Sequence, residues 1–152
     1  MGTDMNFIVE CREDTEWRPL WKDNDARKEY FNGRGYPTFA MLAGIRDRWG
    51  LVEIHASRGL PEGCLTHTVG ERHYLHGVWL GNYGFSWATL EELIAYTELV
   101  EDEIVTQPYR SGEDMTYREM AKQLWEVVAE LKQRAHLEGA QFADIRCVYG
   151  FA

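Results

Sequence analysis

The stretch TYREMAKQLWEVVAELKQRAHLEGAQFADIRCVYGF, residues 116–151, decides the fold class because it joins a long helix to a strand. Thr116 followed by Glu119 has the form of a capping box, in which each side chain satisfies a free amide at a helix start. Apolar residues then recur at helical spacing until Gly139, a common terminator. Residues 142–151 are strand-like, and a strand that follows a long helix usually pairs inside an existing sheet. The apolar helix positions are Met120, Leu124, Val127, Val128, Leu131 and Ala135.

The first part of the chain predicts a hairpin. Residues 6–13 alternate between two faces with the period of a strand. Residues 16–21 bring a second short strand, in which Pro19 is tolerated at a sheet edge. Residues 23–35 are polar and end in two glycines, which indicates a loop.

The middle of the chain predicts two further helices. Residues 37–49 have apolar positions at helical spacing, and Gly50 supplies a stop. Residues 51–56 are strand-like, and residues 58–63 form a turn. A second capping box begins at Thr89 and predicts a helix to about Val100.

These elements predict an α+β fold, with an antiparallel or mixed sheet and two to three helices packed on it. Residues 64–88 are expected to be irregular or to form short strands. The chain shows no repeat or long linker, so we expect residues 1–152 to form a single domain.

Composition excludes several classes of function. The 152 residues carry a net charge of −9, which disfavours direct binding to nucleic acid or to an anionic membrane. No apolar run is long enough to span a bilayer, and the N-terminus lacks the order of a signal peptide. Three widely spaced cysteines suit a reducing compartment. We therefore expect a cytoplasmic protein.

Charge is unevenly distributed along the chain. Residues 27–72 contain seven basic and five acidic side chains. Residues 89–119 contain nine acidic side chains against Arg110 and Arg118. This polarity predicts a local site for an anion and a separate acidic face.

A metal site is one candidate. Cys64, His67, His73 and His76 offer four possible ligands within thirteen positions. Zinc requires such groups to converge tetrahedrally, and their spacing fits no standard zinc ribbon or finger. The alternative is that these histidines lie on a polar loop and stack on aromatic rings. Neither a nucleophile elbow nor a phosphate loop occurs, so no catalytic residue and no cofactor are predicted.

A ligand site built from arginine, glycine and aromatic residues is the preferred candidate. Guanidinium groups bind phosphate bidentately, aromatic faces stack bases, and glycine loops admit backbone amides to a ligand. The alternative is that these arginines pair with the many acids at the surface. The predicted ligand-binding residues are Arg34, Tyr36, Arg46, Trp49, His55 and Arg58.

Several short blocks of the chain, which run nearly end to end, carry a resemblance to known proteins: residues 1–4 with 9–10, 34–36 with 39–46, 58–61, 86–93 and 145–151. In these blocks the chain resembles a family of small uncharacterised proteins from bacteriophages and actinobacterial mobile elements. The family pattern often has His-Ser-His-Ser where this chain has residues 83–86, YGFS, so the resemblance carries no histidine chemistry over. It implies a phage accessory product, and such small acidic proteins are frequently inhibitors of host defence.

Three functions follow as hypotheses. The first is a protein that binds and sequesters a nucleotide-type signalling molecule and so counters host immunity. The second is an anti-CRISPR-like inhibitor whose acidic face binds a host defence protein, and the third is a metal-assisted hydrolase. We prefer the first, non-enzymatic hypothesis and leave the enzyme question open. The aromatic share of 13% also leads us to expect a homo-oligomer.

Overall fold

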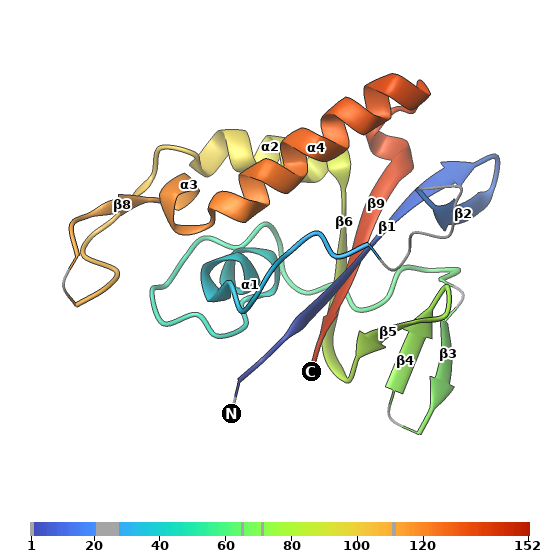
Figure 1. Ribbon diagram of the computed structural model, residues 1–152, viewed down its shortest axis with the longest axis horizontal. Helices are drawn as coiled ribbons and strands as arrows, with labels where there is room; N and C mark the ends of the chain where they lie inside the picture. Colours follow the sequence, from blue (N-terminus) through green and yellow to red (C-terminus); the bar gives the residue numbers. More distant parts are fainter. Residues whose placement is uncertain (1, 21–27, 65, 71, 111) are drawn as a thin grey trace.

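The computed structural model of the protein describes residues 2–20, 28–64, 66–70, 72–110 and 112–152 (Figure 1). Its architecture is α+β, as the sequence predicts, and the sheets of the described residues are antiparallel. Trp21 and residues 23–27, which belong to the predicted hairpin and loop, lie outside the described residues.

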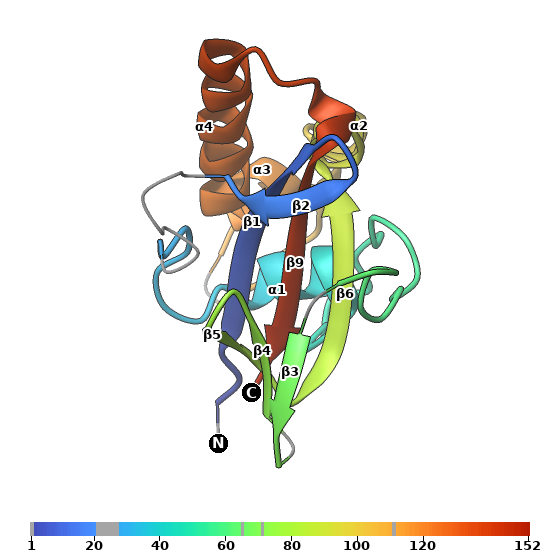
Figure 2. The ribbon, with the colours of Figure 1, turned by 90° about the vertical axis from the view of Figure 1, so that its right-hand side faces the viewer.

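The central sheet has the strand order β2-β1-β9-β6 (Figure 2). The final strand lies between β1 and β6, which confirms that it pairs inside the sheet. Because β9 is covered on both faces, all seven of its residues are buried. Pro19 lies in the edge strand, where its missing amide disrupts no ladder. The strands are β1 (Met5–Glu13), β2 (Glu16–Pro19), β6 (Tyr83–Thr89) and β9 (Ile145–Phe151).

Helices cover one face of this sheet and enclose the larger core. The capping boxes at Thr89 and Thr116 are both formed, as predicted. The predicted long helix is interrupted at Ala121, whose ψ of 46° lies outside the helical range. The predicted apolar positions in α4 are all buried, whereas Met120 in α3 lies outside the core. The helices are α1 (Tyr36–Ala43), α2 (Leu90–Val100), α3 (Tyr117–Met120) and α4 (Lys122–Glu138).

A smaller sheet covers the other face of β1 and β9 (Figure 2). Residues 64–88 thus contain short strands, one of the two predicted alternatives. Leu75 and Leu80 from the smaller sheet pack on Ile8 and Val148 of the central sheet. The strands are β3 (Thr66–Val69), β4 (Arg72–Leu75) and β5 (Val78–Gly81), and a separate pair joins β7 (Ile104–Val105) to β8 (Met115–Thr116).

Two predictions about the segment after the first loop are wrong. The helix predicted over residues 37–49 ends at Ala43, because Gly44 adopts a left-handed conformation with φ of 65°. Residues 51–56 form no strand. Their backbone is held by side chains instead: the Val52 amide donates to the Tyr117 hydroxyl, and the Val52 carbonyl accepts from Tyr96.

Candidate functional site

A pocket of about 490 Å³ opens beside the start of α1 and the loop that follows this helix. The pocket is lined by Tyr36, Gly44, Arg46, Asp47 and Arg48. Tyr36 is the first residue of α1, and the other four lie within the five residues that follow the helix, 44–48. Two predicted ligand residues, Tyr36 and Arg46, therefore meet at one pocket.

The loop that carries the arginines is held in one conformation by its own backbone contacts. Asp47 accepts hydrogen bonds from the amides of Trp49, Gly50 and Leu51 at 2.9–3.0 Å. Arg46 has a φ of 58°, which is uncommon for a residue other than glycine. A residue whose backbone is held in such a conformation is fixed by the surrounding structure, and such residues are frequent at binding sites.

The guanidinium groups of both pocket arginines lie over aromatic rings. Arg46 lies 5.4 Å from the ring centre of Tyr36. Arg48 lies 5.0 Å from the ring centre of Trp49 and 5.9 Å from that of Tyr109. Within the described part of the chain no carboxylate lies at ion-pair distance from Arg48, so stacking leaves its N–H groups available to an anion.

The N-terminal segment positions Arg46 through Thr3, a residue that the sequence argument did not select. The Thr3 hydroxyl accepts from Arg46 Nε at 2.9 Å, and the Thr3 amide donates to the Tyr36 hydroxyl at 3.2 Å. Thr3 is 3% exposed, so its own side of both contacts is buried. No local pattern reveals this role, because 33 and 43 residues separate Thr3 from its two partners.

Arg34 is held near this segment but does not line the pocket. Its Nε donates to Asp4 at 2.9 Å, and this hydrogen bond lowers the pKa of the Asp4 carboxyl below its ordinary value. The Arg34 guanidinium lies against Gly2, where an added Cβ would fall 1.8 Å from Nη1. Arg34 thus forms an ion pair with Asp4, and the phosphate contact predicted for it stays a prediction.

Arg58 is also paired elsewhere. Its guanidinium forms a two-pronged ion pair with Glu92 and lies 4.5 Å from the ring centre of Trp87. The hydrogen bond from Arg58 lowers the pKa of Glu92 to about 2. Because its donors are committed to a carboxylate at the start of α2, Arg58 does not join the pocket residues.

The last two predicted ligand residues differ in their relation to the pocket. Trp49 lies behind Arg48 as its stacking partner and donates its ring N–H to the Pro108 carbonyl at 3.1 Å. His55 contacts the Ala56 carbonyl through Nδ1 at 2.9 Å and is not a lining residue. Trp49 thus supports the site, whereas the role predicted for His55 finds no support in this geometry.

The four candidate metal ligands are not gathered in space. His67 stacks on Tyr74, and His73 packs against Phe85. His76 donates to Glu10 at 2.7 Å. In the ranges that the structure describes, no group of three or more His, Cys, Asp or Glu side chains is arranged to hold a metal ion.

Burial governs the chemistry of the cysteines. It raises the pKa of Cys64 to about 11 and also raises that of Cys11 and of Cys147. All three thiols are free. Thiols with raised pKa values are poor nucleophiles at neutral pH, which argues against a cysteine-based reaction.

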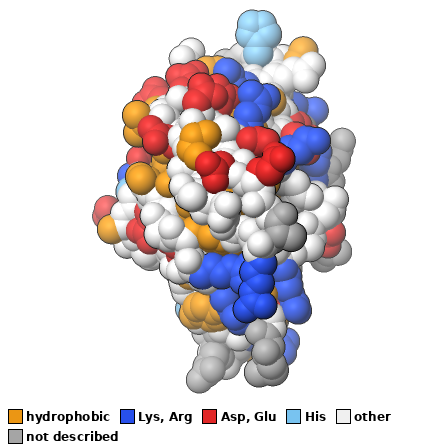
Figure 3. All heavy atoms as spheres, turned by 90° about the vertical axis from the view of Figure 1, so that its left-hand side faces the viewer, with side chains coloured by type: hydrophobic (Ala, Val, Ile, Leu, Met, Phe, Trp, Pro, Cys, Tyr) orange, Lys and Arg blue, Asp and Glu red, His pale blue; other side chains and the backbone are white. Residues whose placement is uncertain are grey.

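The uneven charge of the sequence is visible on one face of the molecule (Figure 3). Lys and Arg side chains gather in the lower part of this face, and above them Asp and Glu side chains are interspersed with further Lys and Arg side chains. The lower cluster is thus the more uniformly charged surface on this face.

Comparison with protein-family models, curated proteins and solved structures found no match. The resemblance to phage and mobile-element proteins therefore stays a prediction. None of the helices in the described ranges combines the length and the apolar character needed to cross a bilayer.

Proposed function

We propose that the protein binds a nucleotide-like anion in the pocket formed by Tyr36, Gly44, Arg46, Asp47 and Arg48, which we call the arginine pocket. The observation that carries this proposal is Arg48, an exposed guanidinium that is stacked on two aromatic rings with no carboxylate partner in the described ranges. Such a group presents a planar array of donors suited to phosphate.

The surroundings of Arg48 supply the other features of a nucleotide site. Arg46 brings a second positive charge whose position is set by Thr3 and Tyr36. Gly44 is left-handed, and a Cβ added there would fall 1.7 Å from the Glu53 carboxylate, so only glycine fits at this edge of the pocket. The Tyr36 ring offers an aromatic surface for a base. Asp47 is occupied by three backbone amides, which offsets its repulsion of an anion.

The biological role that we propose with this site is sequestration. A protein that binds a nucleotide-type signal without converting it removes the signal from a host defence pathway. In this proposal the protein acts in the cytoplasm of the host cell, without a cofactor and as a homo-oligomer. The resemblance to phage accessory proteins motivates this setting.

Calorimetry tests the binding. The titrants are cyclic dinucleotides, cyclic trinucleotides and isomers of cyclic ADP-ribose, with inorganic phosphate as a reference. The variant Arg48→Met keeps the stem that packs on Trp49 and removes the charge. We expect affinity for the bound nucleotide to fall roughly ten- to a hundredfold, since a hydrogen bond to a charged group contributes about 1.5–3 kcal/mol.

Arg118→Met is the matched control, because Arg118 is an exposed arginine paired with Glu101 away from the pocket. Its affinity should equal that of the unmodified protein. Absence of heat with every nucleotide in the panel would refute the proposal, and an equal loss in both variants would show that only overall charge matters.

The acidic surface favours a second candidate, the inhibition of a basic defence protein. Residues 101–103 are all acidic and lie in the segment between α2 and β7, and Glu113 and Asp114 flank β8 nearby. Co-purification of a basic host protein that is lost at high salt, and that is unaffected by Arg48→Met, would support this candidate.

A further inference from the structure

The outer edge of β1 is only half covered by a neighbouring strand. β2 pairs with residues 10–13 of β1, and the Leu20 amide donates to the Val9 carbonyl at 3.1 Å. Before Val9, no residue of β2 pairs with β1. The edge from Met5 to Phe7 therefore has no partner strand among the described residues.

The alternation of the ladder shows which backbone groups point out of this edge. Asp4 and Ala152 exchange two hydrogen bonds, so their peptide groups face β9, and the same orientation recurs at every second residue of β1. The peptide groups of Met5, Phe7 and Val9 therefore face away from β9, toward the outer edge of the sheet. The bond from Leu20 to Val9 confirms this alternation from the other end of the edge.

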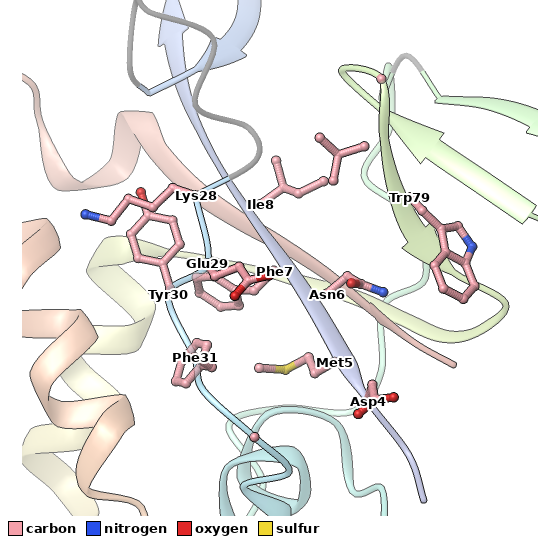
Figure 4. A pocket seen from close by; sticks show the side chains of 13 residues that line it. Asp4, Met5, Asn6, Phe7, Ile8, Lys28, Glu29, Tyr30, Phe31 and Trp79 are labelled. Carbon is pink, nitrogen blue, oxygen red and sulfur yellow. The ribbon is translucent and has the colours of Figure 1, made fainter.

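A groove of about 560 Å³ lies along this edge (Figure 4). Its floor is formed by residues 4–8, and its two walls by residues 28–31 and 77–79. In Figure 4 the side chains of Met5 and Phe7 extend toward the first wall, and Asn6 extends toward Trp79 in the second. The groove thus runs along the free edge of β1, with one wall on each face of the sheet.

We propose that this groove, which we call the β1 groove, binds an extended peptide that adds as a strand along the free edge from Met5 to Phe7. The peptide amides and carbonyls would pair with those of Met5 and Phe7, and its alternate side chains would contact the two walls. The five residues of the groove floor, residues 4–8, span about 13 Å as a strand, and this distance sets the length of the bound peptide segment. This site is separate from the arginine pocket.

The charge of the groove favours one kind of peptide. Glu29 is exposed in the first wall, and no cation in the described ranges lies within ion-pair distance of it. The chain also carries a net charge of −9, so a peptide with alternating apolar and basic side chains is favoured. A second copy of the chain fits less well, because its own β1 edge lies between the same two walls.

Hydrogen exchange of the free protein is the first test. The amides of Asn6 and Ile8 face β9 and should exchange slowly, whereas the amide of Phe7 faces the groove and should exchange faster by about tenfold or more. Equal protection of Phe7 and Ile8 in the free chain would overturn the proposal.

Binding of the peptide acetyl-Val-Lys-Val-Lys-Val-amide is the second test. Saturation should slow exchange at Phe7 by about tenfold or more, with no change at Asn6 or Ile8. A version with N-methylated peptide bonds keeps the side chains and charge but loses the backbone donors, and it should bind at least about tenfold more weakly. Equal binding of both peptides, or protection elsewhere only, would refute strand addition.

Glu29→Gln separates the charge of the groove from that of the whole protein. It should weaken binding of the lysine peptide about three- to tenfold at low salt. Glu98→Gln, which removes an exposed charge from α2, should leave binding unchanged. Equal effects of the two variants, or no binding to the unmodified protein, would contradict the proposed site.

Discussion

The two faces of the central sheet are built in different ways. On the helix side, β1 and β9 present apolar residues to α1, α2 and α4, and the one buried hydroxyl among them, that of Tyr149, donates to the Leu42 carbonyl at 2.9 Å. On the side of the smaller sheet, the apolar cluster has four fully buried members, and a buried ion pair of Glu10 with Arg146 lies in the same layer.

The ion pair shows what the small core requires. Glu10 and Arg146 are opposite each other in the β1–β9 ladder, and Arg146 Nε donates to Glu10 at 2.7 Å. The guanidinium lies 4.0 Å from the ring centre of Trp17, yet Nη2 has no hydrogen-bond partner in the described residues. Buried charges contribute little net stability, but they are costly to leave unpaired. The apolar face toward the helices thus stabilises the fold. On the opposite face, the Glu10–Arg146 pair restricts how the smaller sheet packs on the central sheet.

The largest effect should come from breaking this pair. Arg146→Met removes the guanidinium opposite Glu10 and leaves the buried carboxylate with His76 as its remaining side-chain partner, which should lower the free energy of unfolding by about 3–5 kcal/mol. Adding Glu10→Met removes the second charge and should recover most of this loss. Urea denaturation measures both variants, and a double variant as unstable as the single one would show that the pair itself is stabilising.

Equal deletions on the two faces should have unequal effects. Leu131 in α4 and Leu75 in β4 are both 0% exposed. Leu131→Ala should lower the free energy of unfolding by about 3–4 kcal/mol, within the range for buried leucines, whereas Leu75→Ala should cost about 2 kcal/mol because the small cluster can collapse around the gap. Urea denaturation of the pair tests this difference. Equal losses would mean that the two cores are packed with the same rigidity.

The pair of Arg58 and Glu92 links the start of α2 to the loop before the smaller sheet, and it predicts a pH dependence. The pKa of Glu92 is lowered from 4.5 to about 2. The contribution of the ion pair to the free energy of unfolding is therefore fully present above pH 4.5 and is lost as the pH falls through about 2. Glu92→Gln can keep the capping box but not the charge, and should cost about 1 kcal/mol at neutral pH. Its stability should change less than that of the unmodified protein between those pH values, measured by urea denaturation. Parallel pH profiles would contradict this assignment.

Local patterns predicted the elements whose signals are local. Both capping boxes, the first hairpin and the insertion of the terminal strand were predicted correctly. Residues 51–56 were misassigned because their backbone is satisfied by side chains distant in sequence, Tyr96 and Tyr117. Such contacts leave no periodic signal.

Only part of the candidate site was predicted, because some of its contacts also join residues that are distant in sequence. Tyr36, Arg46 and Trp49 lie close together in sequence and meet at or behind the arginine pocket. Arg34 and Arg58 were predicted as ligand residues, but each pairs with a carboxylate that is 30 or 34 residues away. Residue type alone does not reveal which arginine has an acid beside it in the fold. Thr3 was missed because its role depends on the same kind of distant contact.

The smallest effect concerns His76, which contacts the second carboxylate oxygen of Glu10 from the turn between β4 and β5. His76 has a φ of 52°, so His76→Asn is the suitable variant: asparagine tolerates this left-handed backbone, and its side chain is too short to replace the ring. We expect a loss of about 1 kcal/mol in the free energy of unfolding, the usual contribution of one hydrogen bond to a partly exposed group. In the Glu10→Met, Arg146→Met background the same substitution should have no effect, because the acceptor is gone. If His76→Asn lowers the free energy of unfolding by the same amount in that background, His76 acts through the conformation of the turn. Glu10 and Arg146 would then form a pair without His76, and not a three-residue network.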